Sequence, residues 1–388
     1  MINLIVNNGS ASKKYSFYNE DGLIISVHYE KEDDNYIKTE NLNGSKEKTE
    51  ITIDKFKNSF EDLIKSVIDK KIIASEDEIN KVGIRVVSPG TYFQEHRKID
   101  SIFMENLEEK KNMSPLHIEP VQQEINEVLD RLPKIPFYAI SDSNFHKDKP
   151  DYASIYSYPK KISKEMDIYR FGYHGLSVSS IVEKLKEGGL PEKIIVCHLG
   201  GGSSISAVKN GVSIENSMGY SPVEGVPMAT RSGDLDPNSI FSIMDYEGYD
   251  TKDMQNIIYK ESGIKGISGI SSDTRVILAE ANKGNKDAEL ALDYYTYKIK
   301  KIIGSYYVVL GGLDAVVFTG TIGNRASEVR RRVCEGLESI GLDIDQSKNK
   351  MLVQDEGVIS KTDSKVVAYV LETAEMDEMN NILNDISL

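Results

Sequence analysis

Cysteine and positive charge are scarce in this chain, and each shortage excludes a class of protein. Its 388 residues include 2 cysteines, Cys197 and Cys334. Two cysteines cannot form a disulfide framework, so a reducing, cytoplasmic location is expected. The formal net charge of −14 argues against nucleic acid or an anionic membrane as a partner, because either would require a basic face. A small anionic substrate would then depend on a few local arginines.

Long apolar runs are missing as well. The most apolar stretch, residues 306–318, contains Gly311, Gly312 and Asp314 and is too short to span a bilayer. It predicts the end of a helix followed by a buried strand. The first residues lack a basic region followed by a long apolar run, so no signal peptide is expected. Because 388 residues exceed one ordinary hydrophobic core, we expect two domains.

The most informative motif is the glycine-rich segment at residues 197–204, which reads Cys-His-Leu-Gly-Gly-Gly-Ser-Ser. An apolar strand is predicted before it, and residues 205–208 and 212–217 predict two further strands joined by a turn. Glycines let backbone N–H groups approach an anion with no Cβ in the way. We interpret the segment as a phosphate-binding loop on a β-hairpin. It is not a Walker loop, because no Gly-Lys-Ser/Thr leads into a helix.

The same pattern occurs at the N-terminus. Residues 2–6 predict a strand, residues 7–14 read Asn-Asn-Gly-Ser-Ala-Ser-Lys-Lys, and two more strand-like segments surround the turn at Asp21-Gly22. Such an internal repeat suggests two similar lobes, each with one phosphate-binding hairpin. Either unit alone would more simply be an ordinary β-hairpin. The pair, with hydroxyls beside each glycine, favours nucleotide or phosphate binding.

Mixed helices and strands are predicted for the rest of the chain, which indicates α/β lobes. Hydrophobic periodicity predicts helices at residues 56–70, 121–132, 176–187, 288–310, 326–340 and 375–383, and strands at 82–87, 137–140, 315–319 and 365–371. The charged, turn-rich residues 30–48 predict an exposed hairpin or loop.

Two arginines are candidates for binding an anion. Arg231 lies in a polar, turn-rich segment, and its planar fork of donors suits a carboxylate or phosphate. Ser232 and Asp234 could orient it, although a surface ion pair beside a helix that begins at Pro237 would explain the pattern too. Arg85 lies inside an apolar strand, where a charge is costly unless it is paired. An edge strand with an outward arginine is an equal alternative.

Other candidates are single polar residues at the ends of predicted elements. Asp142 follows a predicted strand, where α/β proteins often place functional carboxylates, although a turn aspartate is the commoner case. Of the histidines, His174 lies between two glycines on a loop and is best placed to face a ligand. No histidine pair has metal-ligand spacing. The strand–turn–helix at residues 315–326 is a weak nucleotide signal.

Several long motifs together resemble one family. They are His198-Leu199-Gly200 with its glycine–serine run and residues 216–222, 230–237, 267–275 and 333–337. In this order they resemble the acetate kinase family, that is, the acetate, propionate and butyrate kinases of the sugar kinase–Hsp70–actin superfamily. The resemblance runs from Asn7 to near the C-terminus.

The resemblance implies two actin-like, ribonuclease H-like α/β lobes with an active-site cleft between them. The first lobe would comprise residues 1–143 with a C-terminal helix at 375–388, and the second, nucleotide-binding lobe residues 144–374. The implied reaction is reversible phosphoryl transfer from ATP to acetate or a similar short-chain carboxylate, giving an acyl phosphate and ADP, with Mg²⁺ or Mn²⁺. A cytoplasmic homodimer is implied as well.

The resemblance also assigns roles to residues by motif. The catalytic residues would be Arg85, Asp142, His174 and Arg231. The substrate would contact Arg85, Val87, Leu116, His117, Tyr173 and Pro222. Asn7 and Glu375 would hold the metal. The first phosphate loop would use Ser10, Ser12 and Lys14, and the second His198, Gly200, Gly201, Gly202 and Ser203. The nucleoside would lie against Asp273, Thr274, Arg275, Gly320, Thr321, Ile322, Gly323, Asn324 and Arg325.

The departures from the family pattern cluster at the loops and the nucleoside segment. The usual Asn-Cys-Gly-Ser-Ser-Ser-Leu-Lys differs from residues 7–14 here, and Gly-Gly-Ile-Gly-Glu-Asn becomes Gly-Thr-Ile-Gly-Asn-Arg at residues 320–325. Ile84 and Ser88 replace histidines, Gly201 replaces asparagine, and Tyr173 replaces the more usual phenylalanine. These changes leave open another donor such as pyrophosphate, another short acid, or an inactive nucleotide-binding homologue.

Overall fold

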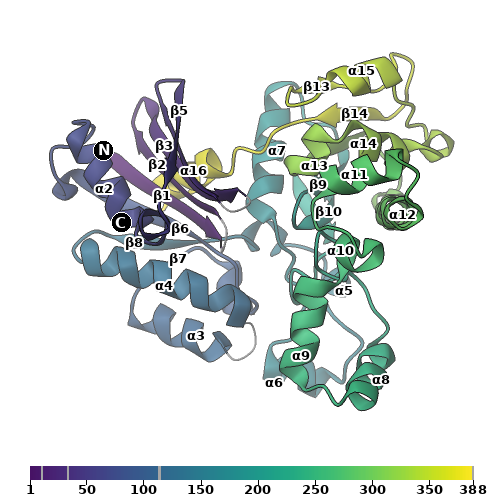
Figure 1. Cartoon of the computed structure of the whole chain (residues 1–388), viewed down its shortest axis with the longest axis horizontal. Helices are drawn as coiled ribbons and strands as arrows, with labels where there is room; N and C mark the ends of the chain where they lie inside the picture. Colours follow the sequence, from purple (N-terminus) through teal and green to yellow (C-terminus); the bar gives the residue numbers. More distant parts are fainter. Residues whose placement is uncertain (10–11, 33–34, 112–114, 387–388) are drawn as a thin grey trace. The chain divides into compact units, whose positions relative to one another are not determined.

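The chain forms two compact units, seen in a computed structural model that describes residues 1–9, 12–32, 35–111 and 115–386 (Figure 1). Unit 1 comprises Met1–Asn144 and Ala374–Leu388, and unit 2 comprises Phe145–Thr373. The expected cleft between the two units stays a prediction. Among the described residues, no helix combines the length and apolar character needed to cross a membrane.

Unit 1 is built on a mixed sheet with the strand order β5-β4-β3-β2-β1-β6-β8-β7. The strands are β1 (Ile2–Gly9), β2 (Ser12–Asn19), β3 (Gly22–Glu32), β4 (Asn35–Leu42), β5 (Ser45–Ile51), β6 (Ile79–Val86), β7 (Arg97–Lys98) and β8 (Phe137–Ser141). Strand β1 is antiparallel to β2 and parallel to β6, and β6 is parallel to β8. The charged residues after β3 form the β4–β5 hairpin, as predicted.

Alternation along the central strands of unit 1 gives the sheet two different faces. Leu4 and Val6 belong to the main core, which the first helices of the chain cover. Those helices are α1 (Ile53–Lys57), α2 (Ser59–Asp69), α3 (Ser101–Lys111) and α4 (Pro115–Arg131), with short turns at Glu76–Glu78, Thr91–Gln94 and Asn144–His146. Ile5 and Gly83 point to the opposite face, where Leu383 of α16 (Glu375–Asp385) packs.

Unit 2 repeats the strand pattern of unit 1. Its sheet has the order β11-β10-β9-β12-β14-β13. The strands are β9 (Lys193–Leu199), β10 (Ser203–Lys209), β11 (Val212–Asn216), β12 (Ala315–Thr319), β13 (Gly357–Val358) and β14 (Val367–Val370). Strand β9 is antiparallel to β10 and parallel to β12, which is parallel to β14. The order β3-β2-β1-β6-β8 therefore recurs as β11-β10-β9-β12-β14, so the predicted internal repeat is confirmed.

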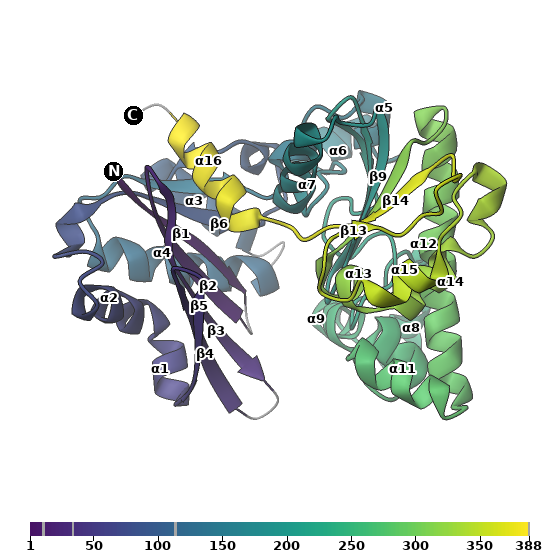
Figure 2. The same ribbon diagram turned by 90° about the horizontal axis from the view of Figure 1, so that it is seen from above.

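Helices cover both faces of the unit 2 sheet (Figure 2). Ile181 and Val182 of α7 (Gly175–Glu187) pack with Ile194 and Val196 on one face. The other face carries the larger core around α12 (Lys286–Leu310). The remaining helices are α5 (Asp151–Ser154), α6 (Lys160–Met166), α8 (Pro237–Glu247), α9 (Thr251–Asn256), the π-helix Ile257–Glu261, α10 (Gly263–Ser268), α11 (Thr274–Asn282), α13 (Gly320–Arg325), α14 (Ser327–Cys334), the 3₁₀ helix Leu337–Ile340 and α15 (Gln346–Met351).

Among the predicted elements whose bounds differ from the structure, three are explained as follows. The helix predicted at residues 326–340 ends at Cys334, because Glu335 is extended and Gly336 has a left-handed φ of 89°. The helix predicted at residues 56–70 is two helices, with Asn58 between them at non-helical dihedral angles. The strand predicted at residues 365–371 is shorter, covering Val367–Val370.

We predict that Gly83→Val destabilises unit 1. A Cβ at Gly83 would already lie 3.2 Å from Leu383 and 3.4 Å from both Ile5 and Ile140, so two further methyl groups overpack this face. The expected loss in the free energy of unfolding is about 1–3 kcal/mol, measured by denaturant titration. Gly304→Ala is the control: it lies inside α12 with open space at its Cβ position and should stabilise by about 0.5–1 kcal/mol. Equal stability of both variants would contradict this packing.

Candidate functional site

Unit 1 places four of the predicted polar residues together on the face that α16 covers. Arg85 Nε donates to Asp142 Oδ1 at 3.0 Å, and Arg85 Nη1 lies 3.4 Å from Asn7 Oδ1. Asn7 Nδ2 in turn donates to Glu375 Oε2 at 3.0 Å. Asn7 is near the end of β1, Arg85 is near the end of β6, and Asp142 follows β8. The C-terminal ends of three neighbouring parallel strands therefore form one cluster.

The Arg85–Asp142 ion pair is the electrostatic centre of this cluster. Asp142 is 1% exposed, and its backbone N–H donates to Val86 O at 3.0 Å. Burial alone would lower the pKa of Arg85, but the charges of Asp142 and Glu375 outweigh it and raise that pKa. Because β6 lies between β1 and β8, the alternative of an edge strand with an outward arginine is wrong.

The same cluster contains oxygen atoms suited to a hard cation. Glu375 supplies a carboxylate, and Asn7 supplies an amide oxygen with a second lone pair. No group of three or more His, Cys, Asp or Glu side chains that could hold a metal occurs among the described residues. Mg²⁺ typically takes one or two carboxylates and completes its shell with water and substrate phosphates. The donor set at Asn7 and Glu375 therefore fits Mg²⁺ held jointly with a phosphate chain.

Side chains that flank the first glycine loop make several hydrogen bonds. Asn8 Oδ1 accepts from the backbone N–H of Lys14 at 2.9 Å, and Asn8 Nδ2 donates to Tyr15 Oη at 3.1 Å. Tyr15 Oη in turn donates to the buried Glu124 at 2.8 Å. Ser12 Oγ lies 2.7 Å from His28 Nε2. Ser10 lies outside the described residues.

The predicted acyl-pocket residues of unit 1 lie on two elements. Val87 is half-buried directly after β6. Leu116 and His117 belong to the first turn of α4, and their side chains fall outside the described part of the chain.

Unit 2 brings His174, Arg231 and the second glycine loop together. A Cβ added to Gly202 would lie 3.3 Å from His174 Nε2 and 3.4 Å from Arg231 Nη1. The rings of His174 and His198 are 4.3 Å apart between centroids, and His174 Nδ1 lies 3.0 Å from Ser204 Oγ. Two potential donors to an anion thus converge on one glycine.

His174 is held in a left-handed conformation at the start of α7, with φ of 58°. Two side chains contact the backbone oxygen of the preceding residue, Tyr173. His146 Nε2 lies 3.0 Å from this oxygen, and Asn216 Nδ2 donates to it at 3.3 Å. A Cβ at Gly172, which has φ of 81°, would meet the His146 ring at 2.9 Å. The sequence analysis did not assign a role to His146 or Asn216.

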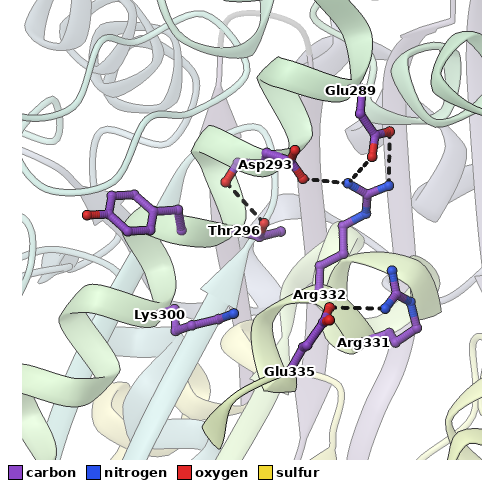
Figure 3. A pocket seen from close by; sticks show the side chains of 8 residues that line it. Glu289, Asp293, Thr296, Lys300, Arg331, Arg332 and Glu335 are labelled. Carbon is purple, nitrogen blue, oxygen red and sulfur yellow. Dashed lines mark hydrogen bonds and ion pairs between the residues drawn. The ribbon is translucent and has the colours of Figure 1, made fainter. Parts of the chain in front are cut away.

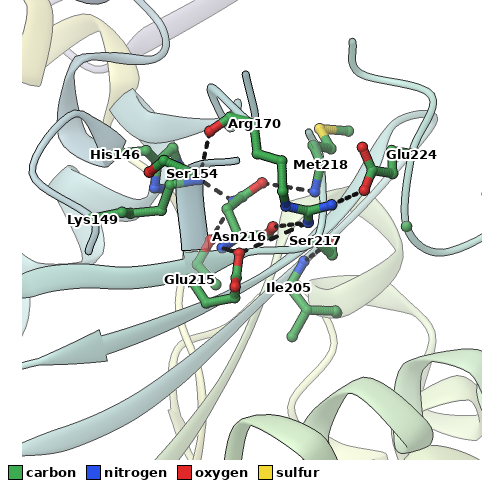
Figure 4. A network of polar contacts seen from close by, with 12 residues as sticks. His146, Lys149, Ser154, Arg170, Ile205, Glu215, Asn216, Ser217, Met218 and Glu224 are labelled. Carbon is green, nitrogen blue, oxygen red and sulfur yellow. Dashed lines mark hydrogen bonds and ion pairs between the residues drawn. The ribbon is translucent and has the colours of Figure 1, made fainter. Parts of the chain in front are cut away.

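A network of polar contacts surrounds His146 and Asn216 (Figure 4). Arg170 pairs with Glu224 and donates through Nη2 to Asn216 O at 3.1 Å. Burial lowers the pKa of His146 to about 3, with a further contribution from Lys149. Because His146 is neutral, one of its ring nitrogens can donate to Tyr173 O while the other faces Ser213 Oγ at 2.7 Å. The network therefore holds the His174 backbone without a buried positive charge at His146.

Tyr173 and Pro222 connect the predicted acyl pocket to Arg231. Tyr173 is 1% exposed, and its hydroxyl donates to Tyr220 O at 2.7 Å. Arg231 Nη1 donates to Pro222 O at 3.1 Å. The hydroxyl that distinguishes Tyr173 from phenylalanine is thus bonded to the segment that also binds Arg231.

The loop that carries Arg231 rests on the π-helix Ile257–Glu261 and the start of α10. Thr230 Oγ1 donates to Tyr259 O at 2.8 Å, and Ser232 N donates to Ile258 O at 3.0 Å. Gly263, with φ of 64°, faces the same loop, and a Cβ there would lie 2.6 Å from Arg231 O. The packing of the Arg231 loop against the π-helix and Gly263 was not predicted from the sequence.

Ser232 and Asp234, which on the sequence pattern could orient Arg231, each make a hydrogen bond to the backbone. Ser232 Oγ donates to Gly233 O at 2.9 Å, and Asp234 Oδ1 accepts from Gly225 N at 2.8 Å. These two bonds shape the turn that follows Arg231. Asp236 caps α8 with Pro237 in its first turn, which confirms the predicted helix start.

The second glycine loop lies beside the strand-to-helix turn at Gly320. A Cβ at Gly200 would lie 3.8 Å from Thr321 N, and one at Gly320 would meet Leu199 O at 2.6 Å. The position beside Gly201 is open. Ser203 is fully buried, with Oγ 2.9 Å from Tyr295 Oη.

The end of β12 and helix α13 carry polar atoms that fit a bound ligand. Within the described chain, the buried Thr319 Oγ1 and Asn324 Oδ1 have no hydrogen-bond partner. Ile322 and Gly323 are buried, whereas Thr321 and Arg325 are exposed. On α11, Asp273 caps the helix that begins at Thr274 and pairs with Arg275.

A cavity of about 360 Å³ between α12 and α14 is a separate feature of unit 2 (Figure 3). Arg332 in it binds Asp293 at 2.8 Å and Glu289 at 2.9 Å. Arg331 binds Glu335 at 3.2 Å. Neighbouring carboxylates neutralise both arginines. Their ion pairs link α12 to α14 and the residue after it, so we interpret the cavity as part of the packing between these helices.

Comparison with known proteins identifies the family. The family model described as "Acetokinase family" matches residues 2–380. The chain belongs to the acetokinase family. It is 39% identical to the acetate kinase of Methanosarcina acetivorans over 382 residues, which is 96% of this chain and 93% of that protein. It is 36% identical to the acetate kinase of Clostridium novyi, with 98% and 99% of the two chains covered.

Solved structures give the same assignment for this acetokinase and confirm the actin-like fold. The acetate kinase of Porphyromonas gingivalis matches with a TM-score of 0.85 and 32% identity, covering 98% of each chain. A propionate kinase of Francisella tularensis matches with a TM-score of 0.87 and 30% identity, covering 97% of each chain.

We predict that Gly263→Ala disables the acetokinase by moving Arg231. Its Cβ would clash with Met228 O at 2.2 Å and Arg231 O at 2.6 Å, so the Arg231 loop must shift. Because misplacement by about 1 Å can cost about 10²-fold in rate, kcat should fall by about that factor. Gly248→Ala is the matched control: its φ is also left-handed, but its Cβ position is open. It should lose about 1 kcal/mol of stability and keep its turnover; equal kcat in both variants would contradict the argument.

Proposed function

We propose that this acetokinase catalyses the reversible, ATP-dependent phosphorylation of a short-chain carboxylate, with acetate as the principal acid. The convergence of His174 and Arg231 on Gly202, in a chain of this family, carries the proposal. Acetate is the acid in the names of the relatives, and propionate appears in the name of one structural neighbour.

Unit 2 supplies groups suited to binding the phosphoryl group during its transfer. Gly200, Gly201 and Gly202 place no side chain beside the backbone of the second loop, and we propose that this backbone, with Ser203 and His198, lines the phosphate site. Arg231 and His174 would donate to the equatorial oxygens, where charge develops in the transition state. Since His174 Nδ1 lies 3.0 Å from Ser204 Oγ and Arg231 Nη1 donates to Pro222 O, both side chains need little reorganisation during the reaction.

Unit 1 supplies a second guanidinium and the oxygen donors. Asp142 binds Arg85 Nε, so the guanidinium is fixed while other N–H groups remain for the carboxylate or the transferring phosphoryl group. Ser12 and Lys14 of the first loop, with Ser10, would contact the nucleotide phosphates. Asn7 and Glu375 would hold Mg²⁺ or Mn²⁺, which when bound neutralises charge on the phosphate oxygens.

The acid would be selected by a small apolar pocket. We propose that Val87, Leu116, His117, Tyr173 and Pro222 contact its tail. One methylene in such a pocket changes the transition-state free energy by about 1–3 kcal/mol, so acids of similar length would compete.

The nucleoside would lie against α13 and the start of α11. Its contacts would come from Asp273, Thr274, Arg275, Gly320, Thr321, Ile322, Gly323, Asn324 and Arg325. The buried, unpartnered oxygens of Thr319 and Asn324 support a polar ligand there among the described residues. No observation favours pyrophosphate or an inactive homologue. We also propose a cytoplasmic homodimer.

Arg231→Ala should reduce turnover with ATP and acetate by at least about 10³-fold, because a guanidinium that stabilises phosphoryl-transfer charge contributes about 10³–10⁵. Acyl phosphate trapped as hydroxamate gives the rate. Arg331→Ala is the control, since Arg331 only pairs with surface carboxylates of α14 and Glu335, and its turnover should match the wild type. Near-normal turnover of Arg231→Ala would refute the assigned role. Nucleotide binding by the wild type without acyl phosphate from any short acid would refute the function.

Tyr173→Phe should change the preference among acids more than the maximal rate. It removes the 2.7 Å hydrogen bond to Tyr220 O and so frees one wall of the proposed pocket. We expect the kcat/KM ratio of propionate to acetate to change by about threefold or more, consistent with the small energies of such pockets. Ratios measured in parallel for both proteins test this, and an unchanged acid profile would remove Tyr173 from the pocket.

A further inference from the structure

A serine, a histidine and a glutamate form a chain of contacts on the first hairpin of unit 1. Ser12 begins β2, and His28 and Glu30 lie on the neighbouring strand β3, where Ser12 is directly opposite Glu30. Ser12 Oγ is 2.7 Å from His28 Nε2. His28 Nδ1 is 3.5 Å from Glu30 Oε1. This is the order of groups that activates a hydroxyl: nucleophile, base, and carboxylate behind the base.

The charges around His28 decide where its proton lies. Burial, with the charge of Lys14, lowers the pKa of His28 to about 4; Glu32 opposes this shift and Lys48 adds to it. The imidazole is therefore neutral at pH 7 and carries one N–H. Because a carboxylate lies beside Nδ1, the proton is favoured on that nitrogen. Nε2 then accepts the hydrogen bond from the Ser12 hydroxyl.

This orientation is the opposite of what a pure phosphate-binding serine requires. A serine that binds phosphate donates its hydroxyl proton to the anion. With the His28 proton on Nδ1, the proton of Ser12 points to Nε2, and the lone pairs of Oγ face away from the ring. In the first phosphate loop the nearest electrophilic atom would be phosphorus rather than an acyl carbon.

We propose that Ser12 is a phosphoryl acceptor, so that the protein slowly phosphorylates itself in the first glycine loop. The proposal rests on the proposed function, which supplies ATP and acyl phosphate as donors. In the step, Ser12 Oγ forms a bond to phosphorus, and the bond from phosphorus to the ADP or carboxylate oxygen breaks. The hydroxyl proton passes to His28 Nε2, and Glu30 stabilises the imidazolium.

The modification would inhibit the protein. A phosphoserine adds about −1.5 to −2 charge at pH 7 where the nucleotide phosphates would bind. Turnover should therefore fall in proportion to the fraction of Ser12 that is phosphorylated.

The test incubates the full chain with acetyl phosphate alone and, separately, with MgATP alone. Intact mass and peptide mapping follow the modification, and the hydroxamate assay follows turnover in the same samples. We expect one phosphoryl group on Ser12 with at least one donor, and matching loss of turnover. His28→Asn and Glu30→Gln should slow the labelling by about 10²-fold and 10-fold or more, because general-base catalysis contributes about 10²–10⁴. Glu50→Gln, an exposed carboxylate on β5, is the control and should label within about threefold of the wild type.

The outcomes separate this proposal from the function. A protein that makes acyl phosphate but never carries phosphate on Ser12 would overturn the proposal and leave the function intact. Labelling by MgATP without any acyl phosphate formation would support the proposal and overturn the function. An acetyl group on Ser12, or equal labelling in the wild type and in a folded Glu30→Gln variant, would overturn the proposal. Thermal melting verifies that each variant is folded.

Discussion

The arrangement of unit 2 depends on the missing side chain of Gly202. Because that position has no Cβ, His174 Nε2 and Arg231 Nη1 approach it to within 3.3 and 3.4 Å. His174 and Arg231 lie on different parts of the fold. His174 is fixed through the backbone of Tyr173 by buried polar groups, and Arg231 is fixed by a loop that rests on a π-helix. Such π-helical turns occur frequently at functional sites, and here the turn exposes carbonyl oxygens that the Arg231 loop uses.

The repeated topology explains why polar residues distant in sequence meet. In each unit a central strand is antiparallel to its hairpin partner and parallel to the next strand along the sheet. The ends of the parallel strands then lie side by side. In unit 1 this arrangement gathers Asn7, Arg85 and Asp142, and in unit 2 it places Gly320 against Leu199. One folding pattern, used twice, thus creates two polar edges with different chemistry.

Sequence alone predicted what depends on alternation and local turns. It gave both hairpins, the strand before Asp142 and the strand-to-helix turn at Gly320, because their signals lie within a few residues. It missed His28, whose contact with Ser12 needs the register between two strands, and His146, which acts on a backbone oxygen 27 positions away. The π-helix leaves little compositional signal, since its distinction is a hydrogen-bond pattern. The end of the helix before Gly336 was not predicted, because the helical pattern of apolar residues continues on both sides of this glycine.

The last helix of the chain belongs to the first unit. Leu383 of α16 packs against Gly83, Lys81 donates to two carbonyl groups at the end of this helix, and Glu375 at its start binds Asn7. A ribosome releases the N-terminal sheet long before it makes α16. During synthesis, the apolar positions Ile5 and Ile140 therefore lack their cover until α16 emerges. The nascent first unit therefore lacks one face of its packing until α16 has been made.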